Sequence, residues 1–123
     1  MTQCFLVEPF VHAFLGPLIA LALPGQPRRR FTLQEAMILS RALTAVAKGA
    51  SAERSIYMSP AASDCDFEAR VVSSGLVVVS ERSADATLSF EEALGLAEAL
   101  KEAAEASLRG TTAGQESEDR WPM

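Results

Sequence analysis

Histidine occurs once in this chain of 123 residues and cysteine occurs twice, so few imidazole and thiol side chains are available for proton transfer, nucleophilic attack or zinc binding. Cys4 and Cys65 form no Cys-x-x-Cys pair, whereas a zinc site needs about four ligands in closely spaced pairs. We therefore expect no metal and no other cofactor. One disulfide between the two cysteines is the alternative to two free thiols, and we favour free thiols in a reducing cytoplasm.

Basic residues are also in the minority. Eleven Lys and Arg residues stand against sixteen Asp and Glu residues, which gives a net charge of −5 at pH 7. Binding to nucleic acid needs a basic face that attracts phosphate, so direct binding to nucleic acid is disfavoured. An acidic surface suits a basic partner protein instead.

A long uninterrupted apolar run is missing as well. The apolar stretch 4–23 is about long enough to span a membrane, and three arginines follow it. Polar, glycine and proline residues break it, however, so we interpret it as two strands and expect no membrane segment. The interrupting residues are Glu8, Pro9, His12, Gly16 and Pro17.

Two amphipathic helices are the strongest positive features. Thr32 with Glu35, and Ser89 with Glu92, have the spacing of a capping box, in which each residue bonds a free amide of the first turn. Apolar residues follow each box with helical periodicity. When the two segments are aligned at an offset of 57 residues, their capping residues coincide and their apolar residues fall at matching positions. This correspondence predicts a duplicated unit.

Each helix follows a predicted hairpin. Residues 66–73 alternate apolar and polar, Ser74-Gly75 supplies a turn, and the aliphatic run 76–80 predicts a central strand. In the first unit, the strands 5–15 and 18–23 flank Gly16-Pro17. A proline at position 9 predicts an edge strand or a bulge.

These elements predict an α+β domain of two layers, a pseudo-duplicated ββα-ββα chain. Its four-stranded, mostly antiparallel sheet carries both helices on one face. We expect one domain over residues 1–109, with units at about 3–49 and 55–109. Residues 110–123 are polar and acidic without apolar periodicity, and they predict a disordered tail.

The first hairpin is apolar on both faces, because Phe5, Phe10 and Phe14 lie among aliphatic residues. If the helices cover one face of the sheet, the other is left open to water, which a monomer rarely tolerates over several hundred Å². We therefore predict a protein-binding surface at these three residues, and a homodimer. The alternative is that loops, or the carboxyl-terminal tail with Trp121, cover this face.

Two charged clusters provide further candidates. Glu98, Glu102 and Glu105 lie within two turns of the second helix and predict an acidic face for a basic partner. The cluster Arg28–Arg30 directly precedes the first helix cap, where guanidinium groups and a helix N-terminus together suit an anion.

No catalytic constellation is present. The leading hypothesis is a non-enzymatic protein–protein interaction module in the cytoplasm, a small acidic inhibitor or adaptor such as phages and mobile elements encode. The alternative is a small anion- or ligand-binding domain, or a weak enzyme, that uses Arg28–Arg30 and His12.

Overall fold

The computed structural model describes residues 5–62, 66–80 and 83–112. It contains two helices and two antiparallel sheets, which confirms the predicted α+β class. The tail predicted at 110–123 falls mostly outside the described residues, although the second helix continues to Thr112. Cys4 and Cys65 lie outside them too, so their state stays a prediction.

The first sheet, sheet A, has the strand order β1-β2-β3, and adjacent strands in it are antiparallel. Its strands are β1 (Leu6–His12), β2 (Gly16–Ala22) and β3 (Arg29–Thr32). The edge position predicted from Pro9 is confirmed, since β1 lies at one end of the sheet. Leu18 and Ile19 point to opposite faces of β2, and both are fully buried. The open apolar face that we expected is therefore closed at the centre of this sheet.

The second sheet, sheet B, has the order β4-β5-β6-β7. Its strands are β4 (Ser55–Met58), β5 (Phe67–Val72), β6 (Gly75–Val79) and β7 (Ala86–Ser89). The aliphatic run 76–80 is predicted to form a central strand. This is confirmed, because β6 lies between β5 and β7.

The predicted turn of the second hairpin is shifted by one residue. Val72 pairs with Gly75, so residues 73 and 74 form the turn and the glycine belongs to β6. Its lack of a side chain matters for packing, because a Cβ there would collide with the carbonyl oxygen of Leu88 on β7.

The helices are α1 (Leu33–Ala47) and α2 (Phe90–Thr112), and both begin at the predicted capping boxes. The Glu35 amide donates to Thr32 Oγ1 at 3.1 Å, and the Thr32 amide donates to Glu35 Oε1 at 2.9 Å. Ser89 and Glu92 exchange the same two bonds at the start of α2. Neither helix, over its described residues, is long and apolar enough to cross a membrane.

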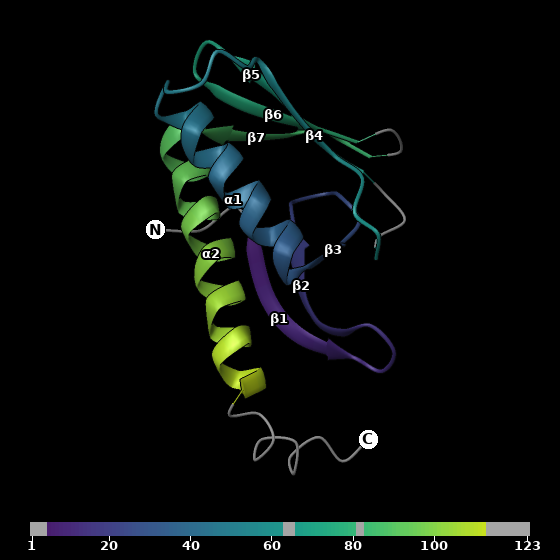
Figure 1. The fold of residues 1–123 in the computed structure, drawn as a ribbon. Coiled ribbons are helices and arrows are strands. Elements are labelled where there is room, and N and C mark those ends of the chain that lie inside the picture. Colours follow the sequence, from purple (N-terminus) through teal and green to yellow (C-terminus); the bar gives the residue numbers. More distant parts are fainter. Residues whose placement is uncertain (1–4, 63–65, 81–82, 113–123) are drawn as a thin grey trace.

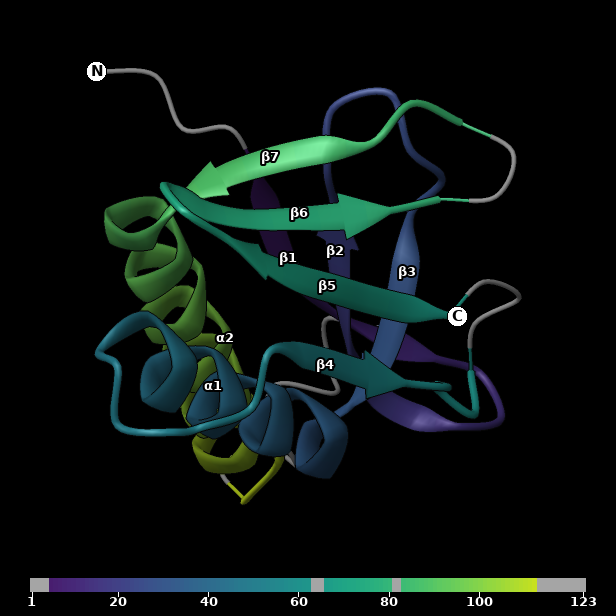
Figure 2. The same ribbon diagram turned by 90° about the horizontal axis from the view of Figure 1, so that it is seen from above.

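The helices lie side by side and run in opposite directions (Figure 1). Sheet B lies over sheet A, and its strands run across those of sheet A (Figure 2). The sheets meet where Phe31 of β3 and Phe67 of β5 place their rings 6.4 Å apart, edge to face. One core joins both sheets and both helices, including Ile19, Leu21, Leu39, Leu43, Leu76, Val78, Leu88, Leu96 and Leu100.

The predicted single four-stranded sheet with both helices on one face is thus replaced by two sheets. The physical reason is that the chain forms three further short strands, β4 at the edge of β5, and β3 and β7, which each lead into a helix. The added strands of each sheet come from the same half of the chain as its hairpin. The two halves therefore contact each other through the hydrophobic core and not through strand pairing.

The two halves repeat their element order at a fixed offset. β3 and α1 begin at Arg29 and Leu33, and β7 and α2 begin 57 residues later at Ala86 and Phe90. This correspondence is compatible with the predicted duplication. The second half differs in one respect, because β4 adds a strand at the outer edge of β5.

Candidate functional site

The turn between β1 and β2 is held by the side chain of His12. Its Nδ1 atom accepts hydrogen bonds from the amides of Phe14 at 3.0 Å and Leu15 at 3.1 Å. Gly16 then adopts a φ of 80°, a left-handed conformation that costs glycine little. The turn therefore has a defined backbone, and it lies just before the predicted Gly16-Pro17.

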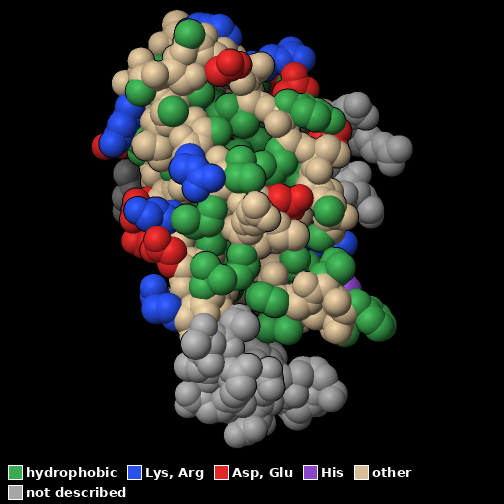
Figure 3. Space-filling model, in the orientation of Figure 1, with side chains coloured by type: hydrophobic (Ala, Val, Ile, Leu, Met, Phe, Trp, Pro, Cys, Tyr) green, Lys and Arg blue, Asp and Glu red, His purple; other side chains and the backbone are tan. Residues whose placement is uncertain are grey.

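Three large apolar side chains surround this turn, and we call them the hairpin tip. Val11 is 47% exposed, Phe14 is 91% exposed and Leu15 is 55% exposed. Figure 3 shows hydrophobic side chains gathered at this end of the molecule, beside the single histidine. Contiguous apolar surface of this kind typically marks a binding site.

The other two predicted phenylalanines have different surroundings. Phe5 is half-buried, packs against the core and comes close to Gly95 of α2. Phe10 is also half-buried, on the face of β1 that carries its partner Leu18. Of the predicted set Phe5, Phe10 and Phe14, the last alone projects into water. Sequence reasoning missed Val11 and Leu15, which the displaced turn brings beside it.

The predicted acidic face lies on α2, where Glu98 and Glu102 are exposed and Glu105 is half-buried. Lys101 is exposed within this stretch, and Arg109 follows one turn after Glu105. The charges on this part of the helix are therefore mixed, and their field toward a basic partner is weakened.

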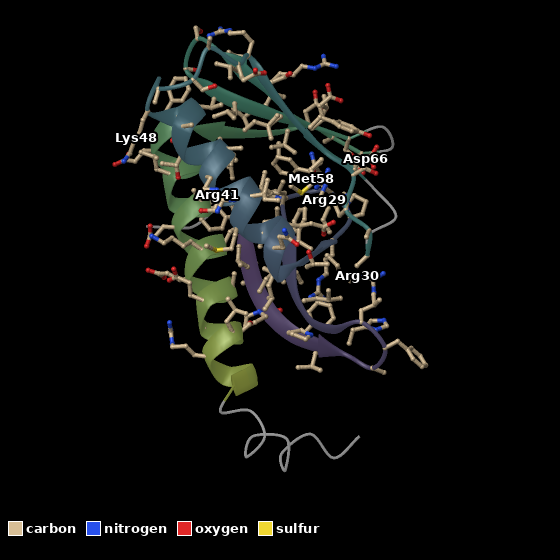
Figure 4. The ribbon with its side chains drawn as sticks, viewed as in Figure 1. Arg29, Arg30, Arg41, Lys48, Met58 and Asp66 are labelled. Carbon is tan, nitrogen blue, oxygen red and sulfur yellow. The ribbon has the colours of Figure 1, made fainter. Side chains whose placement is uncertain are left out.

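The three arginines of Arg28–Arg30 do not converge. Arg29 is 1% exposed, and its Nε donates to the Asp66 carbonyl oxygen at 2.9 Å while its Nη1 donates to Gln26 Oε1 at 2.8 Å. Its guanidinium also lies 5.6 Å from the ring centroid of Phe67. Figure 4 shows it beside Met58 and Asp66, with Arg30 apart from this group.

The neighbouring arginines point the other way, because side chains alternate along a strand. Arg28 forms an exposed ion pair with Glu8 at 3.7 Å. His12 pairs with Gly16, whereas Arg30 pairs with Ala20, four residues and so about 13 Å further along β2, and the two residues lie on opposite sides of that strand. The geometry therefore does not assemble the arginines and the histidine into one anion site.

One polar pair was not predicted. The Tyr57 hydroxyl on β4 donates a 2.5 Å hydrogen bond to Asp66 Oδ2. This bond, with a smaller contribution from Ser59, lowers the pKa of the Asp66 carboxyl below its ordinary value of 3.8. The same bond, with burial and the carboxylate charge, raises the pKa of the Tyr57 phenol above 10.0. Tyr57 lies on β4 and Asp66 directly precedes β5, so the pair depends on how these strands pack, which sequence spacing does not reveal.

Within the described ranges, no three His, Cys, Asp or Glu side chains gather as metal ligands. No family model, no curated protein and no solved structure matches this chain.

Proposed function

We propose that this chain is a non-enzymatic protein–protein interaction module and that the hairpin tip is its binding element. The observation that carries the proposal is Phe14, 91% exposed on a turn that His12 holds by two hydrogen bonds. An aromatic side chain on an ordered turn loses little conformational freedom on binding and buries a large apolar area.

The hairpin tip is favoured over the acidic face of α2. Exposed carboxylates next to Lys101 and Arg109 are stable in water and gain little from a partner. An exposed phenylalanine, in contrast, gains free energy whenever a partner removes it from water.

The partner is another protein molecule. If the partner is a second copy of this chain, the two hairpin tips cover each other and form a homodimer. The small size and the net charge of −5 suit an inhibitor or adaptor of the kind found in phages and mobile elements. The scarcity of cysteine supports the cytoplasm as the compartment.

Photo-crosslinking from the tip tests the proposal. A benzoyl-phenylalanine at position 14 should trap a discrete protein in a lysate of cells that naturally make this chain. The same group in place of Ile38, 43% exposed on α1, is the matched control and should trap none. Equal trapping from both positions, or none from position 14, would contradict the proposal.

Sedimentation velocity identifies whether the partner is a second copy. Wild-type protein should then change from 13.1 kDa to twice that mass as its concentration rises. Phe14→Ser should stay at the lower mass. A wild-type mass that is independent of concentration removes the homodimer and leaves a different protein as the partner.

A further inference from the structure

The repeat places corresponding residues of the two hairpins in register. Leu18 of β2 and Gly75 of β6 are 57 residues apart, and their partners on the preceding strands are Phe10 and Val72. The first strands of the hairpins therefore correspond at an offset of 62. On this basis, residues 5–8 at the start of β1 correspond to residues 67–70 of β5.

In sheet B these residues are the ones that receive an extra strand. Ser55–Met58, the whole of β4, pairs antiparallel with residues 67–70 of β5. In sheet A, no strand within the described residues pairs with the outer edge of β1. The pairing of β4 with β5 thus provides a template for an added strand at the corresponding edge of sheet A.

The backbone groups that face this edge follow from the same correspondence. The Val71 amide donates to the Arg54 carbonyl oxygen at 2.9 Å, so position 71 faces outward from its hairpin. Its counterpart on β1 is Pro9, which has no N–H to donate. Val7 lies two residues earlier and faces the same side, with its amide intact. An added strand would therefore stop before Pro9 and use the amide of Val7.

The side chains of β4 indicate the chemistry of the occupant. Ile56 is 8% exposed and joins the core, whereas Tyr57 next to it is 62% exposed. Ile56 pairs with Ala69, the counterpart of Val7, which is itself half-buried against the core. A segment with an aliphatic residue opposite Val7 and alternate side chains in solvent would fit here.

We propose that the outer edge of β1 at residues 5–8 is a strand-addition site, which receives an extended, alternately apolar segment of a partner protein in antiparallel orientation. This inference rests on the proposed function, because the hairpin tip at the other end of the same strand would anchor that partner. Main-chain hydrogen bonds then provide affinity, and the tip provides specificity.

A labelled peptide of residues 53–59, which contains β4, is the probe. Fluorescence anisotropy should show binding to the full chain with a Kd on the order of 0.1 to 1 mM, since a four-residue strand buries little area. A peptide with Ile56→Asp should not bind. In an NMR titration, the amide shifts of residues 5–8 should change. Changes confined to residues 67–70, or no binding at millimolar peptide, would overturn the proposal.

Two proline variants sharpen the test. Val7→Pro removes the outward amide and should weaken peptide binding roughly 3- to 10-fold, the value of one hydrogen bond. Thr87→Pro places a proline on β7, the edge strand of sheet B, away from both residues 5–8 and the hairpin tip, and its affinity for the peptide should equal that of the wild type. Thermal unfolding verifies that both variants fold. If Val7→Pro does not fold, the NMR titration of the wild type alone tests whether the peptide binds at residues 5–8.

The two proposals fail separately. If position 14 still traps its protein in a folded Val7→Pro chain and the peptide does not bind the wild type, the interaction module stands and strand addition is wrong. If the peptide binds at residues 5–8 but position 14 traps nothing, the hairpin tip is not the anchor. Conversion of a wild-type dimer to a monomer by Val7→Pro would identify a second copy as the occupant and would overturn the peptide-like partner.

Discussion

The hydroxyl of Ser40 donates a 2.7 Å hydrogen bond to the carbonyl oxygen of Ala97, and the bond is buried between α1 and α2. The two residues are each eighth in their helix and are 57 positions apart. Residues that contact their own counterpart lie on a twofold axis, as in a symmetric dimer. The contact between equivalent positions of α1 and α2 is therefore compatible with the predicted duplication.

Substitution of Ser40 should show how closely the helices approach. Ser40→Ala loses one hydrogen bond and should lower the free energy of unfolding by about 1 kcal/mol. Ser40→Leu also overfills the crossing and should cost about 3 kcal/mol. Urea unfolding measures both, and Arg41→Ala on the exposed side of α1 should change the free energy by less than about 0.5 kcal/mol. A Ser40→Leu protein as stable as the wild type would argue against a tight crossing.

Gly75→Ala should be strongly destabilising. The added Cβ would collide with the Leu88 carbonyl oxygen and would lie 2.9 Å from the Cα of Ser89, so the backbones of β6 and β7 would have to separate. We expect a loss of about 3 kcal/mol in the free energy of unfolding.

Gly95→Ala is the matched control for that change. Its Cβ would meet the Phe5 ring at 3.8 Å, an ordinary contact, and alanine favours a helix by about 1 kcal/mol over glycine. The thermal midpoint should stay the same or rise. Equal losses in both variants would show that the collision at position 75 is not the cause.

Arg29 should be required for stability, and lysine should not be able to replace it. Arg29→Lys keeps the charge but cannot reproduce two directed bonds to the Asp66 carbonyl and to Gln26. Since both partners are part-buried, we expect a loss of about 2 kcal/mol in guanidinium unfolding. Arg30→Lys, on the opposite face of β3, should change stability by less than about 0.5 kcal/mol. Similar effects at the two positions would contradict a structural role for Arg29.

The Tyr57–Asp66 pair should respond to pH at both ends of the scale. The folded chain lowers the pKa of Asp66, so the pair's contribution to stability is complete above pH 3.8 and is lost as the pH falls through the lowered pKa. The pKa of Tyr57 is raised, so the contribution is present below pH 10.0 and is lost as the pH rises through the raised pKa.

Tyr57→Phe removes the bond and tests this pair directly. An NMR titration of the Asp66 carboxyl carbon should show its pKa returning toward 3.8. Ser59→Ala, which removes the weaker contribution, should move it less. An Asp66 pKa that is the same in the wild type and in Tyr57→Phe would exclude the hydroxyl as the cause.

Local signals predicted part of this fold well. Thr32 with Glu35 and Ser89 with Glu92 placed both helix starts, because capping depends on residues three apart. The strands β3 and β7 were missed, since four residues are too few for a period to appear and Arg29 is a buried charge within one of them. The division into two sheets depends on packing between units, which no local pattern contains.

The candidate site was predicted less completely. Phe14 was identified because an aromatic residue in a hairpin is conspicuous, but its exposure depends on a turn that His12 forms through its ring nitrogen. The mixed charge of α2 could have been recognised from Lys101 and Arg109 in the sequence. The separation of Arg29 from Arg28 and Arg30 follows from strand alternation once β3 is known.

In each half of the chain, one residue both ends the strand before the helix and caps the helix, Thr32 in the first half and Ser89 in the second. No spacer separates the two elements. One residue inserted at either junction would rotate the helix by about 100° and carry its apolar stripe away from the core. A change of length at these two junctions should therefore be far more damaging than one in an exposed loop.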